Sequence, residues 1–171
     1  ARKTAMMLNF RIHGHLRIFM LMILKGHGPN AGKVITEVFS GSGRFGKACN
    51  AHGFSVFLIE LDISKTHDVN RLSVQNSIGY ILQKFRVVLV WCGTPCSSFS
   101  RARRGGNGPP PLRSNLLPMG LDNLKPADSN KVQMGNRLLR FTVALCRMCF
   151  AHQIPFVVEN PGYSRIWITP C

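Results

Sequence analysis

The stretch from Lys33 to His52 constrains the fold of this chain more than any other. Lys33–Phe39 (KVITEVF) is rich in β-branched and apolar residues, and a turn with three glycines, Ser40–Gly46, follows it at once. Lys47–His52 then suits a helix. A buried strand, a glycine turn and a helix in this order are typical of an α/β fold that binds a ligand at the carboxyl end of its first strand.

The pattern continues along the chain. Two more short apolar runs, Ser55–Leu61 and Phe85–Trp91, predict strands, with a helix over Val74–Lys84 between them. A long helix over Lys131–His152 and a last strand over Ile154–Val158 follow. Strands that alternate with helices predict a Rossmann-like, doubly wound, mostly parallel sheet, which we expect to stop after about its fifth strand.

The first 30 residues differ from the rest. No acidic residue occurs before Glu37, and apolar residues of the helix-forming kind predict a helix over Met6–Leu24, closed by the breakers of Gly26–Asn30. We therefore expect a basic N-terminal extension over 1–30 and a compact domain over 31–171. Within that domain Gly105–Pro126 is rich in Gly, Pro, Asn and Ser and predicts a long loop.

The charge of the chain predicts its partner. Lys and Arg number 22 against 7 Asp and Glu, which gives a formal net charge of +15. The basic residues are spread along the chain rather than gathered on one amphipathic helix, which favours DNA, RNA or a larger ribonucleoprotein assembly over a membrane surface. The apolar runs are too short to cross a bilayer. A merely solvated basic surface is the alternative.

The six cysteines indicate a compartment rather than a disulfide framework, because a chain of 171 residues that is 45% hydrophobic can build a core without one. We expect an intracellular, reducing compartment: mitochondrial, nuclear or cytoplasmic. The pairs Cys92/Cys96 and Cys146/Cys149 could form a four-thiolate zinc site. Each pair also has another explanation, so no metal is expected.

Parallel strands collect ligands at their carboxyl ends, so the residues after each strand are candidates for function. Gly41 and Gly43 allow backbone to approach a cofactor closely. Glu60 lies at the end of the second strand, 17 residues after Gly43, where dinucleotide-binding folds place an acid on a ribose. Asp68 could accept a hydrogen bond from an adenine amino group, or could equally cap a turn.

The third strand leads into Thr94-Pro95-Cys96, followed by several arginines. A thiol beside guanidinium groups favours its thiolate, which makes Cys96 a candidate nucleophile, with an inert core thiol as the alternative. Glu159 ends the last strand, where a carboxylate needs a partner. That partner could be a base ring nitrogen of a substrate, or a nearby cation such as Arg165.

In order and approximate spacing these motifs resemble the first conserved blocks of the DNA cytosine-5 methyltransferases. The resemblance covers roughly 34–167 and is carried by Val38–Gly43, Glu60, Asp68, Pro95–Ser100 and Glu159–Pro161. The block Pro-Cys-x-x-Phe-Ser and the later Glu-Asn are its specific parts. The residue directly after Glu-Asn is Pro161, where the family has Val, and neither the Gln-x-Arg-x-Arg block nor a target-recognition domain is visible.

The resemblance implies roles for residues of this chain. S-adenosylmethionine (SAM) would be the cofactor. Cys96 would add to C6 of a flipped cytosine while Glu159 contacts N3. The residues implied for the cofactor are Phe39, Gly41, Gly43, Glu60, Asp68 and Pro95, and those expected to contact phosphates are Arg101, Arg103, Arg104 and Arg113.

Two functions fit these observations. The first is a SAM-dependent methyltransferase that acts on cytosine in DNA or RNA. The second is a catalytically inactive protein that keeps the fold and binds RNA, such as a subunit of a mitochondrial ribosome. The Cys96, Glu159 and Glu60 set favours the first, whereas the charge and the acid-free N-terminus favour the second.

Overall fold

The computed structural model describes residues 5–8, 11–12, 16–17, 21–62, 64–103 and 108–170, with side chains from residue 24 onward. The chain divides into two compact parts. The sheet part consists of 1–93 and 145–158, and the loop part consists of 94–144 and 159–171. Helix α3 (Pro126–Ala151) contributes residues to both parts.

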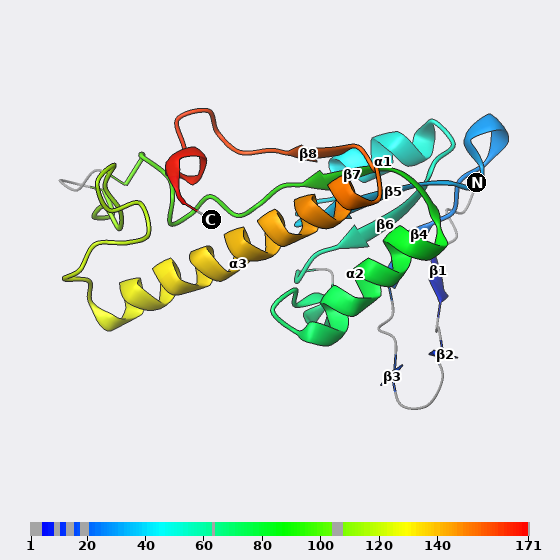
Figure 1. Ribbon diagram of the computed structural model, residues 1–171. Coiled ribbons are helices and arrows are strands. Elements are labelled where there is room, and N and C mark those ends of the chain that lie inside the picture. Colours follow the sequence, from blue (N-terminus) through cyan, green and yellow to red (C-terminus); the bar gives the residue numbers. More distant parts are fainter. Residues whose placement is uncertain are drawn as a thin grey trace. The chain divides into compact units, whose positions relative to one another are not determined.

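The sheet part is built on one six-stranded sheet in the order β1-β4-β6-β5-β7-β8 (Figure 1). Strands β6, β5, β7 and β8 run parallel to one another, whereas β4 is antiparallel to β6 and β1 is antiparallel to β4. A separate two-stranded antiparallel pair joins β2 to β3. The strand bounds are β1 Ala5–Leu8, β2 Arg11–Ile12, β3 Leu16–Arg17, β4 Leu21–Leu24, β5 Lys33–Val38, β6 Ser55–Ile59, β7 Arg86–Cys92 and β8 Phe156–Val158.

The four parallel strands end at one edge of the sheet. Val38, the last residue of β5, lies opposite Ile59 of β6 on one side and Cys92 of β7 on the other, and Cys92 lies opposite Val158 of β8. The chain proceeds from β5 outward to β6 and then crosses to β7 on the far side of β5. A sheet of this kind has its ligand crevice where the strand order reverses, which here is between β5 and β7.

Helices α1 (Arg44–Ala51) and α2 (Leu72–Lys84) connect these parallel strands. The described residues also form the short 3-10 helices η1 (Gly28–Asn30), η2 (Lys65–His67) and η3 (Arg165–Ile168). Because the two crossovers leave β5 and β6 in opposite directions, right-handed connections put α1 and α2 on opposite faces of the sheet (Figure 1). The face beneath α1 carries an apolar cluster of Ile35, Val56 and Leu58. The helix approaches closely because Gly46 has no side chain, since a Cβ there would lie 2.6 Å from Leu58 Cδ2.

The predicted α/β class with parallel strands is confirmed, and each predicted parallel strand and helix after residue 31 lies within a few residues of its expected place. The predicted helix over Met6–Leu24 is wrong. Its described residues form strands, and β4 pairs with β6 from Met22↔Leu58 to Leu24↔Val56. Helix propensity gives way here because the edge of β6 offers backbone hydrogen bonds that only an extended segment can satisfy.

The loop part has a small core of its own. Phe99, Leu139 and Ile166 form a buried cluster, with Val143 packed against it. These residues come from the segment after β7, from α3 and from η3. The loop part therefore gathers the two segments that carry the Pro-Cys and Glu-Asn motifs around the N-terminal two thirds of α3.

Candidate functional site

The turn after β5 has an unusual backbone. Phe39, Gly41 and Gly43 have positive φ angles of 59°, 52° and 65°. This conformation is easy for glycine, but for phenylalanine it costs about 1–3 kcal/mol. The Phe39 N–H is fixed by a hydrogen bond to the Ile59 carbonyl of β6 (2.9 Å). Backbone strain of this kind gathers at binding sites, and this instance lies at the carboxyl end of the central strand.

Glu60 is tied to the same turn. The Gly41 N–H donates to Glu60 Oε2 (2.8 Å), and the Asp62 N–H donates to Oε1 (3.3 Å). A Cβ placed on Gly41 would meet no described atom within 4 Å apart from its chain neighbours, so the glycine faces open space there. Gly43 differs, because its Cβ would press on Leu58 at 3.3 Å. The predicted cofactor residues Gly41 and Glu60 are thus together at one edge of the sheet part, beside open space.

Asp68 has a structural explanation. Its Oδ1 accepts hydrogen bonds from the Asn70 N–H (3.0 Å) and from Asn70 Nδ2 (2.8 Å), and its carbonyl accepts the Arg71 N–H (2.9 Å). The carboxylate therefore caps the turn that leads into α2. Of the two roles open to Asp68 in the sequence, the turn cap accounts for every contact observed.

Glu37 is a buried acid that the sequence analysis did not single out. It is the last residue but one of β5, is 3% exposed, and accepts the Gly46 N–H of α1 through Oε2 (2.8 Å). Burial raises the pKa of Glu37, and the Gly46 hydrogen bond and the Lys47 ammonium only partly oppose this. A single acid inside an otherwise apolar strand run is the signal that could have revealed it. Its carboxylate anchors α1 to the sheet.

In the loop part, the segment after β7 forms a tight turn around Cys96. The N–H groups of Phe99 and Ser100 both donate to the Cys96 carbonyl, at 2.8 Å and 2.9 Å. The Cys96 side chain is half-buried, whereas Cys92 and Cys149 are fully buried. Burial raises the pKa of the Cys92 thiol well above its ordinary value and that of Cys149 to about 11. Those two thiols are core residues, and Cys96 is the more accessible one.

The Glu-Asn-Pro motif lies against the Thr-Pro-Cys motif. Asn160 Nδ2 donates a hydrogen bond of 2.6 Å to the Thr94 carbonyl, 66 residues away in sequence. Thr94 is itself held by a bond of 2.8 Å between its hydroxyl and that of Thr142 on α3. Glu159 is exposed and forms no ion pair with any residue that the structure describes, so the alternative salt bridge to Arg165 is not made. Pro95, which lies between Thr94 and Cys96 in the sequence, is also exposed.

Arg113 corrects one prediction. It was expected to contact phosphate, but it is 1% exposed, and its guanidinium stacks on the Phe99 ring at 3.7 Å. All five N–H donors are used: two go to Ser98, two to Pro118 and Asn136, and one to Val132. Burial lowers the pKa of Arg113 to about 10. The residue joins the Cys96 segment to α3 and has no donor left for nucleic acid.

The other predicted phosphate contacts have different surroundings. Arg103 donates to the Pro110 carbonyl (3.0 Å) and lies 3.9 Å from the Asp128 carboxylate. These two contacts connect Arg103 to the loop after β7 and to the start of α3. Arg104 lies outside the described residues. Arg101 is half-buried and lies near Arg165, since its positive charge adds to burial in lowering the pKa of Arg165.

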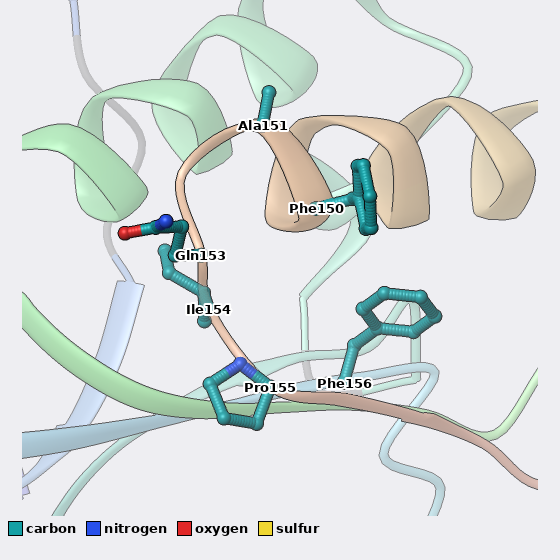
Figure 2. A pocket seen from close by; sticks show the side chains of 6 residues that line it. All are labelled: Phe150, Ala151, Gln153, Ile154, Pro155 and Phe156. Atoms are coloured by element: carbon teal, nitrogen blue, oxygen red, sulfur yellow. The ribbon is translucent and has the colours of Figure 1, made fainter.

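A pocket of about 560 Å³ lies elsewhere, between the end of α3 and the start of β8 (Figure 2). Phe150 and Phe156 lie on one side of it and Gln153 on the other. Because it is at the amino end of β8, it is not the predicted cofactor site. Among the described residues no group of three or more His, Cys, Asp or Glu could hold a metal, and no described helix is long and apolar enough to cross a membrane.

No protein-family model matches the chain, and neither a curated protein nor a solved structure matches it.

Proposed function

We propose that the protein is a SAM-dependent methyltransferase of the cytosine-5 type that acts on nucleic acid. The observation that carries the proposal is the 2.6 Å hydrogen bond from Asn160 to the Thr94 carbonyl. This bond brings together the two segments that bear Cys96 and Glu159, the thiol and the carboxyl group that the reaction needs. The parallel sheet and its strained glycine turn support a methyltransferase type of fold.

The residues of the glycine turn suit the cofactor. Gly41 leaves open space, and Glu60 presents a carboxylate beside it, which could accept hydrogen bonds from a ribose diol. When bound there, SAM would supply an electrophilic methyl group. In this proposal the strain at Phe39 holds the turn open for the cofactor rather than serving the stability of the fold.

The loop part would handle the base. The Cys96 thiolate would add to C6 of a cytosine, and the Glu159 carboxyl group would hydrogen-bond N3, which makes C5 nucleophilic. After C5 has taken the methyl group, loss of the C5 proton would expel the thiolate and restore the aromatic ring. The cytosine must leave its stack to reach a thiol, so the substrate would be single-stranded or locally opened.

A second function is supported by the charge of the chain. A net charge of +15 exceeds what an enzyme needs for solubility and suits a structural RNA-binding protein, such as a mitochondrial ribosomal subunit, in which the site has lost its reaction. The two candidates differ in one measurable property. Only the enzyme has to bind SAM.

Calorimetry with SAM on the full chain tests the proposal. We expect the wild type to bind and Glu60→Gln to bind at least about tenfold more weakly, since a hydrogen bond to a charged group contributes about 1.5–3 kcal/mol. Asp122→Asn is the matched control, because Asp122 is an exposed acid of the loop part. If titration of the wild type with SAM released only the heat of dilution, the proposed enzyme function would be refuted, and the structural RNA-binding function would remain.

A trapping experiment tests the chemistry. An oligonucleotide with 5-fluorocytosine should form a covalent adduct with the wild type in the presence of SAM, because the fluorine blocks elimination. Cys96→Ser should form none, and Cys49→Ser should form it normally, since the Cys49 thiol is in the sheet part and its pKa is raised by burial. An adduct on Cys96→Ser would contradict the assigned nucleophile.

A further inference from the structure

The residues of the C-terminal segment that follows the Glu-Asn-Pro motif take no part in the proposed reaction. It reads Tyr163-Ser164-Arg165-Ile166-Trp167, with Ile166 buried and both aromatic residues exposed. Trp167 is 49% exposed and Tyr163 is 61% exposed. A basic residue between exposed aromatic rings is typical of surfaces that bind unpaired nucleotides.

Trp167 is exposed and yet held in place. Its indole Nε1 donates to the Pro161 carbonyl at 2.9 Å, so the ring has no donor left for solvent or for a ligand. The Ser164 N–H donates to the same carbonyl at 2.8 Å, and Ser164 Oγ accepts the Ile166 N–H, which fixes the segment between them. What the ring still offers is its apolar surface, in one fixed orientation. An ordered ring of this kind can stack on a base at low cost in conformational entropy.

The Arg165 guanidinium forms no ion pair with any residue that the structure describes. Its backbone N–H donates to the Phe99 carbonyl (3.0 Å), which places it two residues from Arg101 along the opposing segment. Its Nε is buried without a hydrogen-bond partner. Burial lowers the pKa of Arg165, and the nearby Arg101 lowers it further. A buried donor without a partner, on a cation that lies beside a second cation, is costly unless an anion binds there.

We propose that Arg101 and Arg165 together bind one phosphate of a nucleic-acid strand, and that Trp167 stacks on an unpaired base of the same strand. The proposal deepens the nucleic-acid part of the proposed function and rests on it, because it names the ligand as an unpaired strand held beside the Glu-Asn-Pro motif. A base in an intact duplex is covered on both faces by its neighbours, so the surface should prefer single strands. Binding needs no SAM, and the test is made without it.

The test is the affinity for a labelled oligothymidylate of about 12 nucleotides, measured by fluorescence anisotropy over a series of salt concentrations. Trp167→Ala should weaken binding about 5- to 100-fold, as expected for the loss of one stacked base, whereas Trp167→Phe should retain most of the affinity. Phe150→Ala is the matched control, because it also removes an exposed aromatic ring, 81% exposed, and should leave the affinity unchanged.

The arginine pair is tested by the salt dependence. Arg101→Gln/Arg165→Gln should lower the slope of log K against log salt by about 0.7, one phosphate contact with a single strand, and by no more than about twice that. Arg137→Gln/Arg140→Gln removes the same charge from exposed positions of α3 and should leave the slope unchanged. Equal slopes for both double variants, or no loss of affinity in Trp167→Ala, would overturn the proposal. These measurements are made without SAM, so their outcome does not depend on whether the protein binds SAM in the calorimetric titration.

The indole also reports directly. The chain contains two tryptophans, and Trp91 stacks on Phe45 in the sheet part, with ring centroids 4.3 Å apart. In a Trp91→Phe variant the remaining fluorescence comes from Trp167. Quenching by the single strand, and much weaker quenching by its duplex, is expected. Fluorescence that stays constant at saturating oligonucleotide would show that no base stacks on this ring.

Discussion

The clearest test of the loop part is a substitution at Gly135, in the interior of α3. Glycine in a helix interior destabilises a protein by about 0.5–1 kcal/mol relative to alanine, so Gly135→Ala would ordinarily be stabilising. Here the space is taken. A Cβ at Gly135 would overlap Ser98 Oγ, and would lie 3.0 Å from Arg113 Nη2 and 3.2 Å from Phe99 Cε2. The glycine lets the Cys96 segment lie directly on the helix.

The magnitude follows from these contacts. To relieve the overlap Ser98 must move, which breaks its 2.9 Å hydrogen bond from Arg113 Nη2. The loss of that bond costs about 1.5–3 kcal/mol, and overpacking of the buried site costs about 1–3 kcal/mol. After subtraction of the gain in helix propensity of about 0.5–1 kcal/mol, Gly135→Ala should destabilise the protein by about 1.5–5.5 kcal/mol. For a chain of this size this corresponds to a fall in Tm of about 3–22 °C.

Thermal unfolding followed by circular dichroism measures the effect, and α2 contains the matched control. A Cβ on Gly79 would meet nothing within 4 Å, so Gly79→Ala should raise Tm by about 1–4 °C. Ser98→Ala removes the oxygen in the way, so the cost of Gly135→Ala should be smaller in that background. If both glycine substitutions were stabilising, the close approach of the Cys96 segment to α3 would be refuted.

Three further predictions concern buried groups. Since burial raises the pKa of Glu37 above 4.5, the folded state binds this proton more tightly than the unfolded chain does. The stability of the wild type relative to Glu37→Gln should therefore fall as pH rises through the folded pKa. A difference in urea midpoint between the two proteins that stays constant from pH 4 upward would contradict this. Iodoacetamide at about pH 8.5 should modify Cys96 well before Cys92 and Cys149, whose pKa values are raised by burial, as followed by peptide mass spectrometry. Arg113→Met should lower the free energy of unfolding, measured in urea, by about 3–5 kcal/mol, because it leaves buried acceptors unpaired. A variant as stable as the wild type would show that the five hydrogen bonds contribute little.

Much of the sheet could be predicted from the sequence because its signals are local. Runs such as Lys33–Phe39 are β-branched and bounded by glycine or polar turns, and parallel strands follow from their alternation with helices. The N-terminal strands could not be predicted in this way. Leu21–Leu24 consists of residues that also favour a helix, and what decides its conformation is the edge of β6, more than 30 residues away in the chain.

The candidate site shows the same division. The positions of Gly41 and Glu60 followed from the rule that ligands bind at the carboxyl ends of parallel strands, and the structure brings them within 2.8 Å. The role of each arginine did not follow, because charge alone does not reveal burial. The sequence suggests Arg165 only as a partner for Glu159, whereas in the structure its backbone hydrogen bond to the Phe99 carbonyl places it near Arg101.

The arginines of the loop part also bear on how a strongly basic chain should be interpreted. Arg113 lies inside the protein with every donor engaged, so it has none left for a phosphate. Arg103 donates to the Pro110 carbonyl and lies 3.9 Å from the Asp128 carboxylate, which partly neutralises its charge. A net charge of +15 therefore overstates the number of cations that can contact nucleic acid. Specific binding depends instead on cations whose donors remain unused and that lie near an ordered aromatic ring. By that criterion Arg165, whose buried Nε has no hydrogen-bond partner and which lies close in sequence to the exposed Trp167 ring, is a better candidate than Arg113 or Arg103.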